Sequence, residues 1–326
     1  CFPPSTAAAA CSGWNMNSPA FQAPAYIQFY PTMGCNMSCS FCFNRSLPET
    51  PDADTADVEK MASVCRSLGI GHIDFLGGEP TLHPELARLI AAICRHGLQV
   101  TLSSNGTRPE ALWALSRHFP ENSLRIGISV NSATLPPGLD EYIRARRPIL
   151  KSVFTHRDLL PGACRPYIGM PGIEYCLIYR DAADAADIEN CPPFDAFCDH
   201  LEALQAQHPG INGVFCGGFV PDIKNTPELA DTRCPAGTTK LSVLPDGSVY
   251  PCYLFFRYPE FCLGNILEHD FSGIWNHPTL DFFRRFSGNP CPRQTCRLHP
   301  KCHGGCPAMS YLYQGRLDAP DPRCVR

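Results

Sequence analysis

Several features that would assign a protein to a common class are missing from this chain of 326 residues. Basic side chains do not predominate, since 27 Lys and Arg stand against 31 Asp and Glu, and they form no stripe of the kind that binds a phosphate backbone. Nucleic acid is therefore not expected as a partner. No stretch holds the roughly 18 successive apolar residues that a membrane-spanning helix needs, and the first residues lack the charged and apolar regions of a secretory signal. The sequence predicts a soluble, cytoplasmic protein without a membrane partner.

Cysteine, in contrast, is abundant. The chain has 20 cysteines, which in such number belong either to disulfide bonds or to metal sites. The expected compartment keeps thiols reduced, and the cysteines gather in short-spaced groups instead of spreading along the chain as cross-links would. Metal binding is therefore the favoured interpretation.

Short β-rich segments alternate with helical ones from residue 25 to about residue 219, which is the pattern of β/α units around a parallel sheet. The helical segments have one apolar face, as in Met61, Val64, Cys65 and Leu68 with their i, i+3, i+4, i+7 spacing. The pattern predicts an α/β fold. Six strands are expected, at residues 25–30, 72–76, 99–103, 124–130, 172–179 and 211–219.

The pattern changes near residue 225. Beyond it come hairpin-like pieces, a helical stretch at about 271–286 and a tail rich in cysteine, proline and glycine. We therefore expect three parts: an irregular N-terminal arm at residues 1–24, a β/α domain at 25–225 and a small cysteine-rich domain at 226–326.

Three thiols follow the first expected strand, at Cys35, Cys39 and Cys42. They lie close together on an expected loop, so that all three can surround one inorganic core. Three ligands are one fewer than a structural zinc ion or a closed four-iron cluster takes, and an open coordination position can bind a substrate or cofactor. Two other interpretations stay open: a zinc site completed by a distant ligand, and an incidental group of thiols.

Small and polar residues follow the next two expected strands. Residues 77–80, Gly-Gly-Glu-Pro, offer bare backbone groups and a carboxylate suited to an amine. Residues 103–107, Ser-Ser-Asn-Gly-Thr, offer hydroxyl and amide groups suited to a ribose or an amino-acid moiety. Each motif alone is also typical of an ordinary turn. Because the carboxyl ends of parallel strands share one face, where active sites form, we expect the three motifs to converge.

This arrangement resembles the radical S-adenosylmethionine (SAM) superfamily, whose Cys-x3-Cys-x2-Cys loop is matched by Cys35, Cys39 and Cys42, with Phe41 before the last cysteine. The resemblance implies a partial (β/α)6 barrel of the TIM type. It also implies that the three thiolates hold a [4Fe-4S] cluster whose fourth iron is chelated by SAM. Reductive cleavage of SAM then yields a 5′-deoxyadenosyl radical that abstracts a hydrogen atom from the substrate.

The family motifs also imply the residues that bind SAM. Residues 77–80 would bind the methionyl amine, Ser104 and Asn105 would lie near the ribose or carboxylate, and the adenine would pack near Leu177 and Ile178, for which a core role is an equal alternative. The full set implied for SAM binding is Phe41, Gly77, Gly78, Glu79, Pro80, Ser104, Asn105 and Ser129.

A second group of cysteines lies in the C-terminal part. Cys234 and Cys252 flank an alternating segment with a Pro-Asp-Gly turn, which predicts a β-hairpin with a thiol near each outer end. A run of four cysteines such as the one that follows this hairpin suits zinc as well as iron when it is taken alone. Because the same chain carries the radical SAM motif, iron–sulfur is favoured. Five more thiols have metal-ligand spacing: Cys291, Cys296, Cys302, Cys306 and Cys324.

This part resembles the SPASM domain, a small cysteine-rich extension that carries auxiliary iron–sulfur clusters in many radical SAM maturases. One departure is that four residues instead of two separate Cys291 from Cys296. The resemblance implies one or two auxiliary clusters. The first would be held by Cys291, Cys296, Cys302 and Cys324. The second would be held by Cys234, Cys252 and Cys306, with Cys216, Cys262 or an open iron site as alternatives for the fourth position.

The resemblance implies an enzyme that modifies a peptide or protein side chain and receives electrons from a donor such as flavodoxin or ferredoxin. Two alternatives stay open: a radical SAM enzyme that acts on a small-molecule cofactor precursor, and a non-catalytic iron–sulfur electron carrier. No catalytic residue is identified, because Asp158, Glu174 and Asp222 are typical of solvated acids on barrel loops.

Overall fold

The computed structural model describes residues 23–45, 47, 50–155, 162–214, 234–293 and 295–323. Almost all of the expected N-terminal arm, and the boundary expected near residue 225, lie outside these residues. The strands are β1 Tyr26–Phe29, β2 His72–Phe75, β3 Gln99–Ser104, β4 Leu124–Ser129, β5 Ile149–Phe154, β6 Tyr175–Tyr179, β7 Ile211–Val214, β8 Lys240–Val243, β9 Ser248–Tyr250 and β10 Gly264–Asn265. The α-helices are α1 Thr55–Ser67, α2 Leu86–Arg95, α3 Pro109–His118, α4 Leu139–Arg146, α5 Phe194–Gln207, α6 Phe271–Trp275, α7 Leu280–Arg285, α8 His299–Cys302 and α9 Pro307–Gln314.

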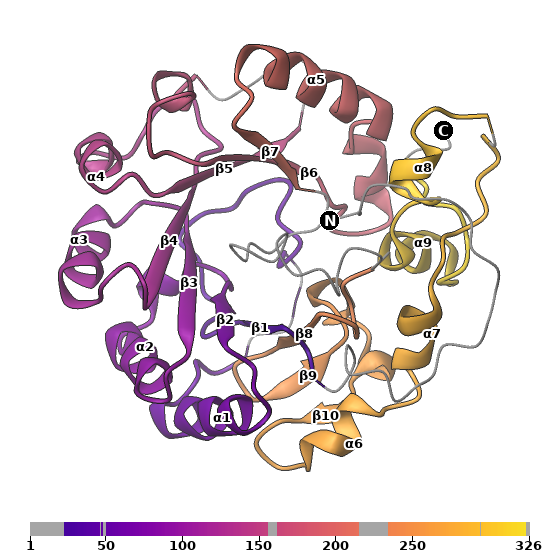
Figure 1. The fold of residues 1–326 in the computed structure, drawn as a ribbon. Coiled ribbons are helices and arrows are strands. Elements are labelled where there is room, and N and C mark those ends of the chain that lie inside the picture. The colour runs from indigo at the N-terminus through magenta and orange to yellow at the C-terminus, as the bar shows by residue number, and fades with distance from the viewer. Residues whose placement is uncertain are drawn as a thin grey trace.

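All described strands form one curved sheet in the order β10-β9-β8-β1-β2-β3-β4-β5-β6-β7. Strands β1 to β7 are parallel to their neighbours, and β8 adds to the free side of β1, also in parallel. Helices α1 to α5 lie outside the curve (Figure 1). The sheet ends at β7 and β10, so that it forms a partial barrel as expected.

The prediction of six strands was wrong by one. Strand β5 was not expected, and the fifth and sixth expected strands are β6 and β7. The sequence Ile-Leu-Lys-Ser-Val-Phe of β5 follows α4 almost directly, and the polar Lys151 and Ser152 interrupt its apolar pattern. Strand β6 begins at Tyr175 instead of residue 172, and residues 215–219 lie outside the described part.

The helical periodicity was informative in the barrel and less so beyond it. Helix α1 begins after Asp54, whose carboxylate accepts the N–H of Ala56 as an N-cap, and buries Met61 and Cys65 as expected. Helix α2 begins at Leu86, two residues after Pro84, and buries Leu89, Ile90 and Ile93. The helix expected at 271–286 is two helices, α6 and α7, because Pro278 lies between them and has no N–H with which to continue α6.

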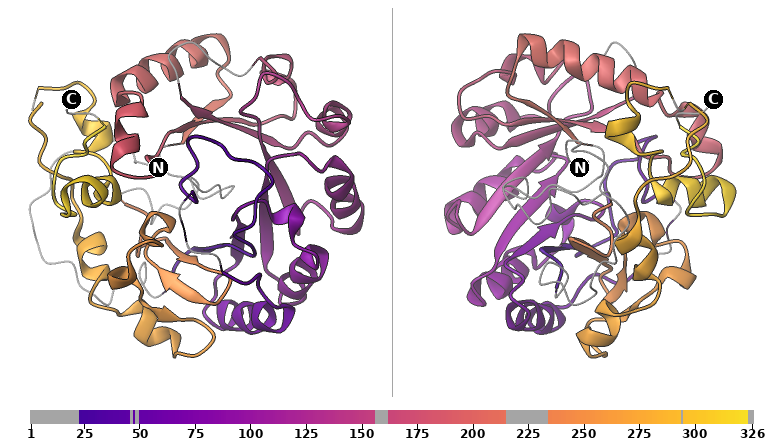
Figure 2. Two further views of the ribbon diagram at one scale, coloured as in Figure 1. Left: turned by 180° about the vertical axis from the view of Figure 1, so that it is seen from behind. Right: turned by 45° about the vertical axis from the view of Figure 1, so that its right-hand side comes forward.

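The hairpin expected between Cys234 and Cys252 is confirmed. Strands β8 and β9 pair antiparallel, with Val243 opposite Val249. Because β8 also pairs with β1, this hairpin extends the barrel sheet, and one continuous hydrophobic core includes residues of both halves of the chain. Figure 2 shows the C-terminal helices beside the ring of β/α units. In the described residues, no helix is long and apolar enough to cross a membrane.

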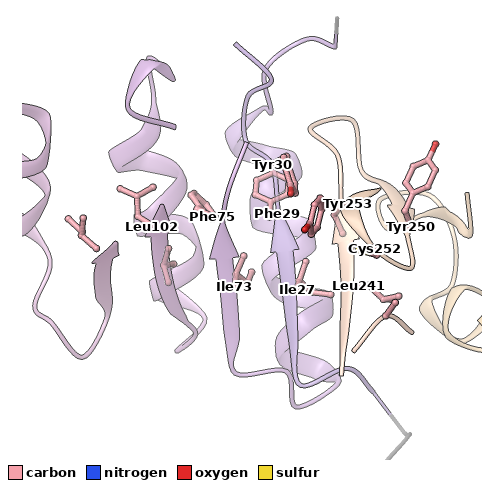
Figure 3. Packing of buried hydrophobic residues seen from close by; sticks show 14 of the residues in the cluster. Ile27, Phe29, Tyr30, Ile73, Phe75, Leu102, Leu241, Tyr250, Cys252 and Tyr253 are labelled. Carbon is pink, nitrogen blue, oxygen red and sulfur yellow. The ribbon is translucent and has the colours of Figure 1, made fainter. Parts of the chain in front are cut away.

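The two faces of the sheet differ in polarity. On one face, Ile27 lies between Ile73 of β2 and Leu241 of β8 in the same register, and all three are buried (Figure 3). At the next position of the same strands, Gln28 is equally buried beside polar neighbours and accepts a hydrogen bond from Ser242 Oγ at 3.1 Å. Because successive side chains point to opposite faces, the inside of the curved sheet is polar, and this is the face on which the site lies.

Candidate active site

A cavity of about 250 Å³ lies at the carboxyl ends of the parallel strands and extends to the C-terminal region. It brings together the three sequence motifs, because the segments after β1, β2 and β3 all line it. Pro80 lies outside the lining, as the buried first residue of the 3-10 helix η2 (Pro80–Leu82). The expected residues that line the cavity are Cys35, Cys39, Cys42, Phe41, Gly77, Gly78, Glu79, Ser104, Asn105 and Ser129.

The three thiols of the first motif lie close enough to influence one another. Burial raises the pKa of Cys39, and the neighbouring Cys42 and Cys35 thiols raise it further. Burial also raises the pKa of Cys42. Because a metal ligand must be the thiolate, binding at this site has to displace protons from these groups. Within the part of the chain described, no three His, Cys, Asp or Glu side chains are arranged around a single metal ion.

The paired glycines allow the loop before Cys35 to lie directly against the end of β2. A Cβ atom at Gly78 would lie 2.0 Å from the carbonyl oxygen of Gly34, and one at Gly77 would lie 2.4 Å from that of Thr32. The backbone N–H of Gly78 donates to Thr32 O at 3.0 Å, and that of Glu79 donates to Gly34 O at 2.8 Å. Only glycine permits this approach, so the Gly-Gly pair sets the position of the cysteine loop.

The carboxylate of Glu79, which is expected to face an amine, is held by hydrogen bonds from the protein itself. Its side chain is 1 % exposed and accepts four hydrogen bonds from the protein. Oε1 accepts from Thr81 N at 3.1 Å, Thr81 Oγ1 at 2.5 Å and Ser104 Oγ at 2.8 Å, while Oε2 accepts from the N–H of Asn105 at 2.6 Å. Glu79 thus joins the ends of β2 and β3.

A cluster of amide and hydroxyl side chains fastens the cysteine loop to the segment after β3, and one of its members, Asn36, was missed. Asn105 Nδ2 donates to Asn36 Oδ1 at 2.9 Å, and Asn36 Nδ2 donates to Thr107 Oγ1 at 2.9 Å. Thr107 Oγ1 in turn donates to Asn105 Oδ1 at 2.6 Å. The side chain of Asn105 is therefore occupied in holding the loop between Cys35 and Cys39.

Lys151 is the main barrel residue that the sequence reasoning missed, because it lies on the unrecognised strand β5. It is 4 % exposed and lines the cavity, where Nζ donates to Ser103 Oγ at 2.6 Å. Its stem passes over Gly127, whose hypothetical Cβ would lie 3.5 Å from Cε. Burial lowers the pKa of Lys151, against the opposing effect of Asp74. The sequence signal that could have revealed it is a lysine within an otherwise apolar strand.

Of the two residues considered for adenine, Ile178 lines the cavity, whereas Leu177 is fully buried in the core on the opposite side of β6. Among the acids considered as bases, Glu174 lies outside the cavity lining, 3.8 Å from Arg125 in an ion pair. Asp158 and Asp222 lie outside the described residues.

The cavity has a second wall, beside the SAM motifs, that the sequence did not reveal. Tyr30 and Asp181 contribute to it from the barrel and Tyr253 from the C-terminal region. The Tyr253 hydroxyl donates to Asp181 Oδ2, and its ring lies 4.3 Å from that of Phe43. Figure 3 shows Tyr253 beside Tyr30, next to Cys252. This second wall therefore links the cavity to an expected auxiliary ligand.

The C-terminal cysteines are brought together in part. Burial raises the pKa of Cys302, and the nearby Cys291 and Cys296 raise it further, which shows that these three thiols are neighbours. Cys324 and Cys216 lie outside the described residues. Cys252 is buried at the end of the β8–β9 hairpin, while Cys234 and Cys306 are half-buried and pack against the same core. Cys262 donates through Sγ to Gly264 O at 3.7 Å.

These residues fit an iron–sulfur cluster with SAM beside it. Three thiols line one side of the cavity, and the glycine pair next to them offers bare backbone groups. The ammonium group of Lys151 on β5 is buried at the cavity wall, where it can pair with a carboxylate. Soft thiolate ligands in a partly enclosed cavity, with a few polar groups on its lining, are what such a cofactor pair requires.

Comparison with known proteins gives consistent matches. Residues 29–172 match the model of the radical SAM superfamily, and residues 234–307 match that of the SPASM iron–sulfur cluster-binding domain. The mycofactocin maturase MftC of Mycobacterium ulcerans is 25% identical over 335 residues, covering 93% of this chain and 88% of that protein. The same maturase of Mycobacterium tuberculosis is 22% identical over 342 residues, covering 93% of this chain and 83% of that protein.

Solved structures share the fold at low sequence identity. Streptococcus suis SuiB bound to SAM gives a TM-score of 0.70 at 18% identity, over 93% of this chain and 76% of SuiB. The enzyme anSMEcpe with bound SAM gives 0.67 at 17% identity, over 92% of this chain and 94% of that chain. The family matches imply a SAM-binding [4Fe-4S] cluster and auxiliary clusters as cofactors. The chain belongs to the radical SAM superfamily of enzymes and carries a C-terminal SPASM domain.

Proposed function

We propose that this chain is a maturase that modifies a side chain of a peptide or protein. The observation that carries the proposal is the two-walled cavity: the SAM motifs form one wall, and the other contains Tyr253, the residue after Cys252. A substrate held between the walls lies next to both cofactor regions. The relatives support a peptide, since two are mycofactocin maturases and SuiB has been solved with the precursor peptide SuiA.

The barrel residues have separate roles in this proposal. Cys35, Cys39 and Cys42 hold the cluster, which together with SAM supplies the 5′-deoxyadenosyl radical. The backbone at residues 77–79 binds the methionyl amine. Glu79 acts mainly by accepting hydrogen bonds from Ser104 Oγ and the N–H of Asn105, which fixes the end of β3 beside SAM. Lys151 faces the SAM carboxylate, because a buried cation stabilises an anion strongly where water is excluded.

The proposal also assigns the auxiliary ligands, the rest of the SAM-binding residues and the electron donor. The auxiliary ligands are the two sets expected from the sequence, with Cys291, Cys296 and Cys302 as neighbours in one of them. Ser129 and Phe41 complete the lining near SAM. An external flavodoxin or ferredoxin provides electrons in the cytoplasm, and the boundary between the two domains lies near residue 225. Because the chain belongs to this superfamily of enzymes, the alternative of a non-catalytic iron–sulfur electron carrier is not proposed.

The test is anaerobic. The full chain is loaded with iron and sulfide, reduced with dithionite and given SAM, and 5′-deoxyadenosine is measured by mass spectrometry beside the variant Cys35→Ala, Cys39→Ala, Cys42→Ala. We expect the product from the native chain alone. Candidate precursor peptides are then coexpressed and examined for a mass change. A change confined to small molecules, with every peptide unaltered, would contradict the proposed substrate class.

A further inference from the structure

A buried group of charged side chains connects the cavity with the proposed auxiliary ligands. It consists of Asp181 at the end of β6 and of Arg323 and Asp321 near the C-terminus, and we call it the Asp181–Arg323–Asp321 network. The side chains of Arg323 and Asp181 are 3% and 9% exposed, and that of Asp321 is 5% exposed. Such a group costs desolvation energy, so it calls for a reason beyond stability.

Asp181 is the end of the network that faces the cavity. Its Oδ2 accepts a hydrogen bond from the hydroxyl of Tyr253, and its Oδ1 accepts one from Nη1 of Arg323 at 3.1 Å. Tyr253 directly follows the proposed ligand Cys252. The ammonium group of Lys240 lies 5.2 Å from the centre of the Tyr253 ring, so a second buried cation faces the same carboxylate region. One carboxylate therefore holds both the hairpin end and the C-terminal segment.

Arg323 is the centre of the network. Nη1 also donates to the carbonyl of Arg180 at 2.8 Å, and the guanidinium lies 4.6 Å from the centre of the Tyr179 ring. Nε and Nη2 donate to the two oxygens of Asp321 at 3.0 and 2.7 Å. This planar, forked arrangement uses several donors of one guanidinium, which a lysine cannot reproduce.

Asp321 carries the network to a second proposed ligand. Its Oδ2 accepts the backbone N–H of Cys306 at 2.9 Å, and its own N–H donates to Gly304 O at 3.1 Å. The approach is so close that a Cβ at Gly305 would lie 2.1 Å from Asp321 Cβ. The position of Cys306 is thus set by the same charges that hold Cys252 through Tyr253.

We propose that the Asp181–Arg323–Asp321 network is a positioning device of the auxiliary site: it holds Cys252 and Cys306 against the end of β6, and its guanidinium raises the reduction potential of the cluster bound there. The inference rests on the auxiliary ligands of the proposed function. Net charge and hydrogen bonds near a cluster set its potential. A buried positive charge favours the reduced, more negative state, because little solvent screens it.

The experiment compares Arg323→Met and Arg323→Lys with Arg316→Met in the full chain loaded with clusters. Arg316 is a matched control, since it pairs with Asp318 on the same tail but is 69% exposed. The measurements are iron per chain, the potentials of the auxiliary clusters by redox titration followed by electron paramagnetic resonance, and thermal unfolding of the cluster-free protein.

For Arg323→Met we expect less auxiliary iron or a more negative auxiliary potential, and for Arg323→Lys a potential near that of the native chain, because the charge is kept. A purely structural role would lower the unfolding temperature of both variants without separating their potentials. If Arg323→Met and Arg316→Met agree in iron and potential, the inference is wrong. Should Arg323→Met not fold, Arg323→Lys decides: because lysine keeps the positive charge, a potential clearly more negative than that of the native chain would overturn the role of the charge.

A Cys306→Ala variant separates this inference from the proposed function. If it loses iron while Arg323→Met behaves like Arg316→Met, the ligand assignment stands and the network has no positioning role. If Cys306→Ala keeps all its iron, the ligand assignment itself fails, and the inference fails with it.

Discussion

The two walls of the cavity are assembled in different ways. On the SAM wall, three short motifs follow neighbouring parallel strands, and backbone contacts such as Gly78 N to Thr32 O hold them together. On the second wall, which we call the auxiliary wall, Asp181 and Tyr253 come from segments far apart in the chain. Asp181 joins them to Arg323, which lies outside the cavity lining, through buried side-chain charges. Strand topology therefore builds the first wall, whereas buried electrostatics builds the second. Each wall should accordingly fail in its own way.

The largest effect is expected for Gly78→Ala on the SAM wall. The new methyl group would lie 2.0 Å from the backbone oxygen of Gly34, which no side-chain rotation can relieve. The loop that carries Cys35 must then move, so we expect loss of 5′-deoxyadenosine formation and of the iron bound there, measured by mass spectrometry and iron analysis. Gly71→Ala, at the other end of β2, is the control, since nothing lies within 4 Å of its added Cβ. Equal activity in the two variants would contradict this account of the SAM wall.

Gly305→Ala is the corresponding change on the auxiliary wall. Gly305 has φ +94°, and the added methyl group would lie 2.1 Å from Asp321 Cβ. Asp321 would be displaced from the N–H of Cys306, so we expect loss of auxiliary iron while the [4Fe-4S] cluster of the barrel still cleaves SAM without substrate. Electron paramagnetic resonance and 5′-deoxyadenosine analysis measure the two separately. Gly273→Ala in α6, with open space around its Cβ, should leave both unchanged. If Gly305→Ala lost both the auxiliary iron and the formation of 5′-deoxyadenosine, the two walls would not be independent.

The same difference explains what the sequence could reveal. Periodicity located α1 and most parallel strands, and the motif spacing located the SAM wall, because neighbouring parallel strands bring local motifs together. Strand β5 was missed since Lys151 breaks its apolar pattern, and the role of Lys151 was missed with it. The auxiliary wall could not be read, because Asp181 lies 72 residues from Tyr253 and 142 from Arg323. Nothing local marks such pairs.

A smaller effect is expected for Glu79→Gln, which tests how far side chains support the SAM wall. The amide keeps one acceptor oxygen but turns an NH2 group toward donors such as Asn105 N and Ser104 Oγ. Hydrogen bonds to a charged acceptor contribute about 1.5–3 kcal/mol each, so we expect a loss of about 3 kcal/mol in the free energy of unfolding, measured by denaturant titration. Glu85→Gln, in an exposed pair with Arg88, should cost less than about 1 kcal/mol. Similar losses would mean that the Glu79 hydrogen bonds add nothing special.

Lys151→Met should separate stability from binding. Burial lowers the pKa of Lys151 below its ordinary value of 10.5, so the folded chain releases this proton at lower pH than the unfolded chain. The free energy of unfolding should therefore rise with pH between the pKa of Lys151 in the folded chain and its pKa in the unfolded chain. The methionine variant should lack this rise and be more stable at neutral pH. Its SAM affinity should fall roughly tenfold, the equivalent of about 1.4 kcal/mol. Calorimetric SAM binding and unfolding at several pH values provide the readouts. A destabilised variant with native affinity would contradict the proposed role.

The smallest effect is expected for Cys262→Ser, which tests whether the auxiliary wall needs a further ligand. Cys262 Sγ donates to Gly264 O at 3.7 Å and lies beside Tyr250, whose pKa is raised to about 12 by burial and then by this thiol. A thiol held as a donor is not poised to bind iron as the thiolate, and serine keeps the same hydrogen bond. We expect iron per chain to match the native value, whereas Cys252→Ala should lose iron. If Cys262→Ser loses as much iron as Cys252→Ala, Cys262 is the fourth ligand. The auxiliary wall would then depend on one more distant segment, which would widen its contrast with the SAM wall.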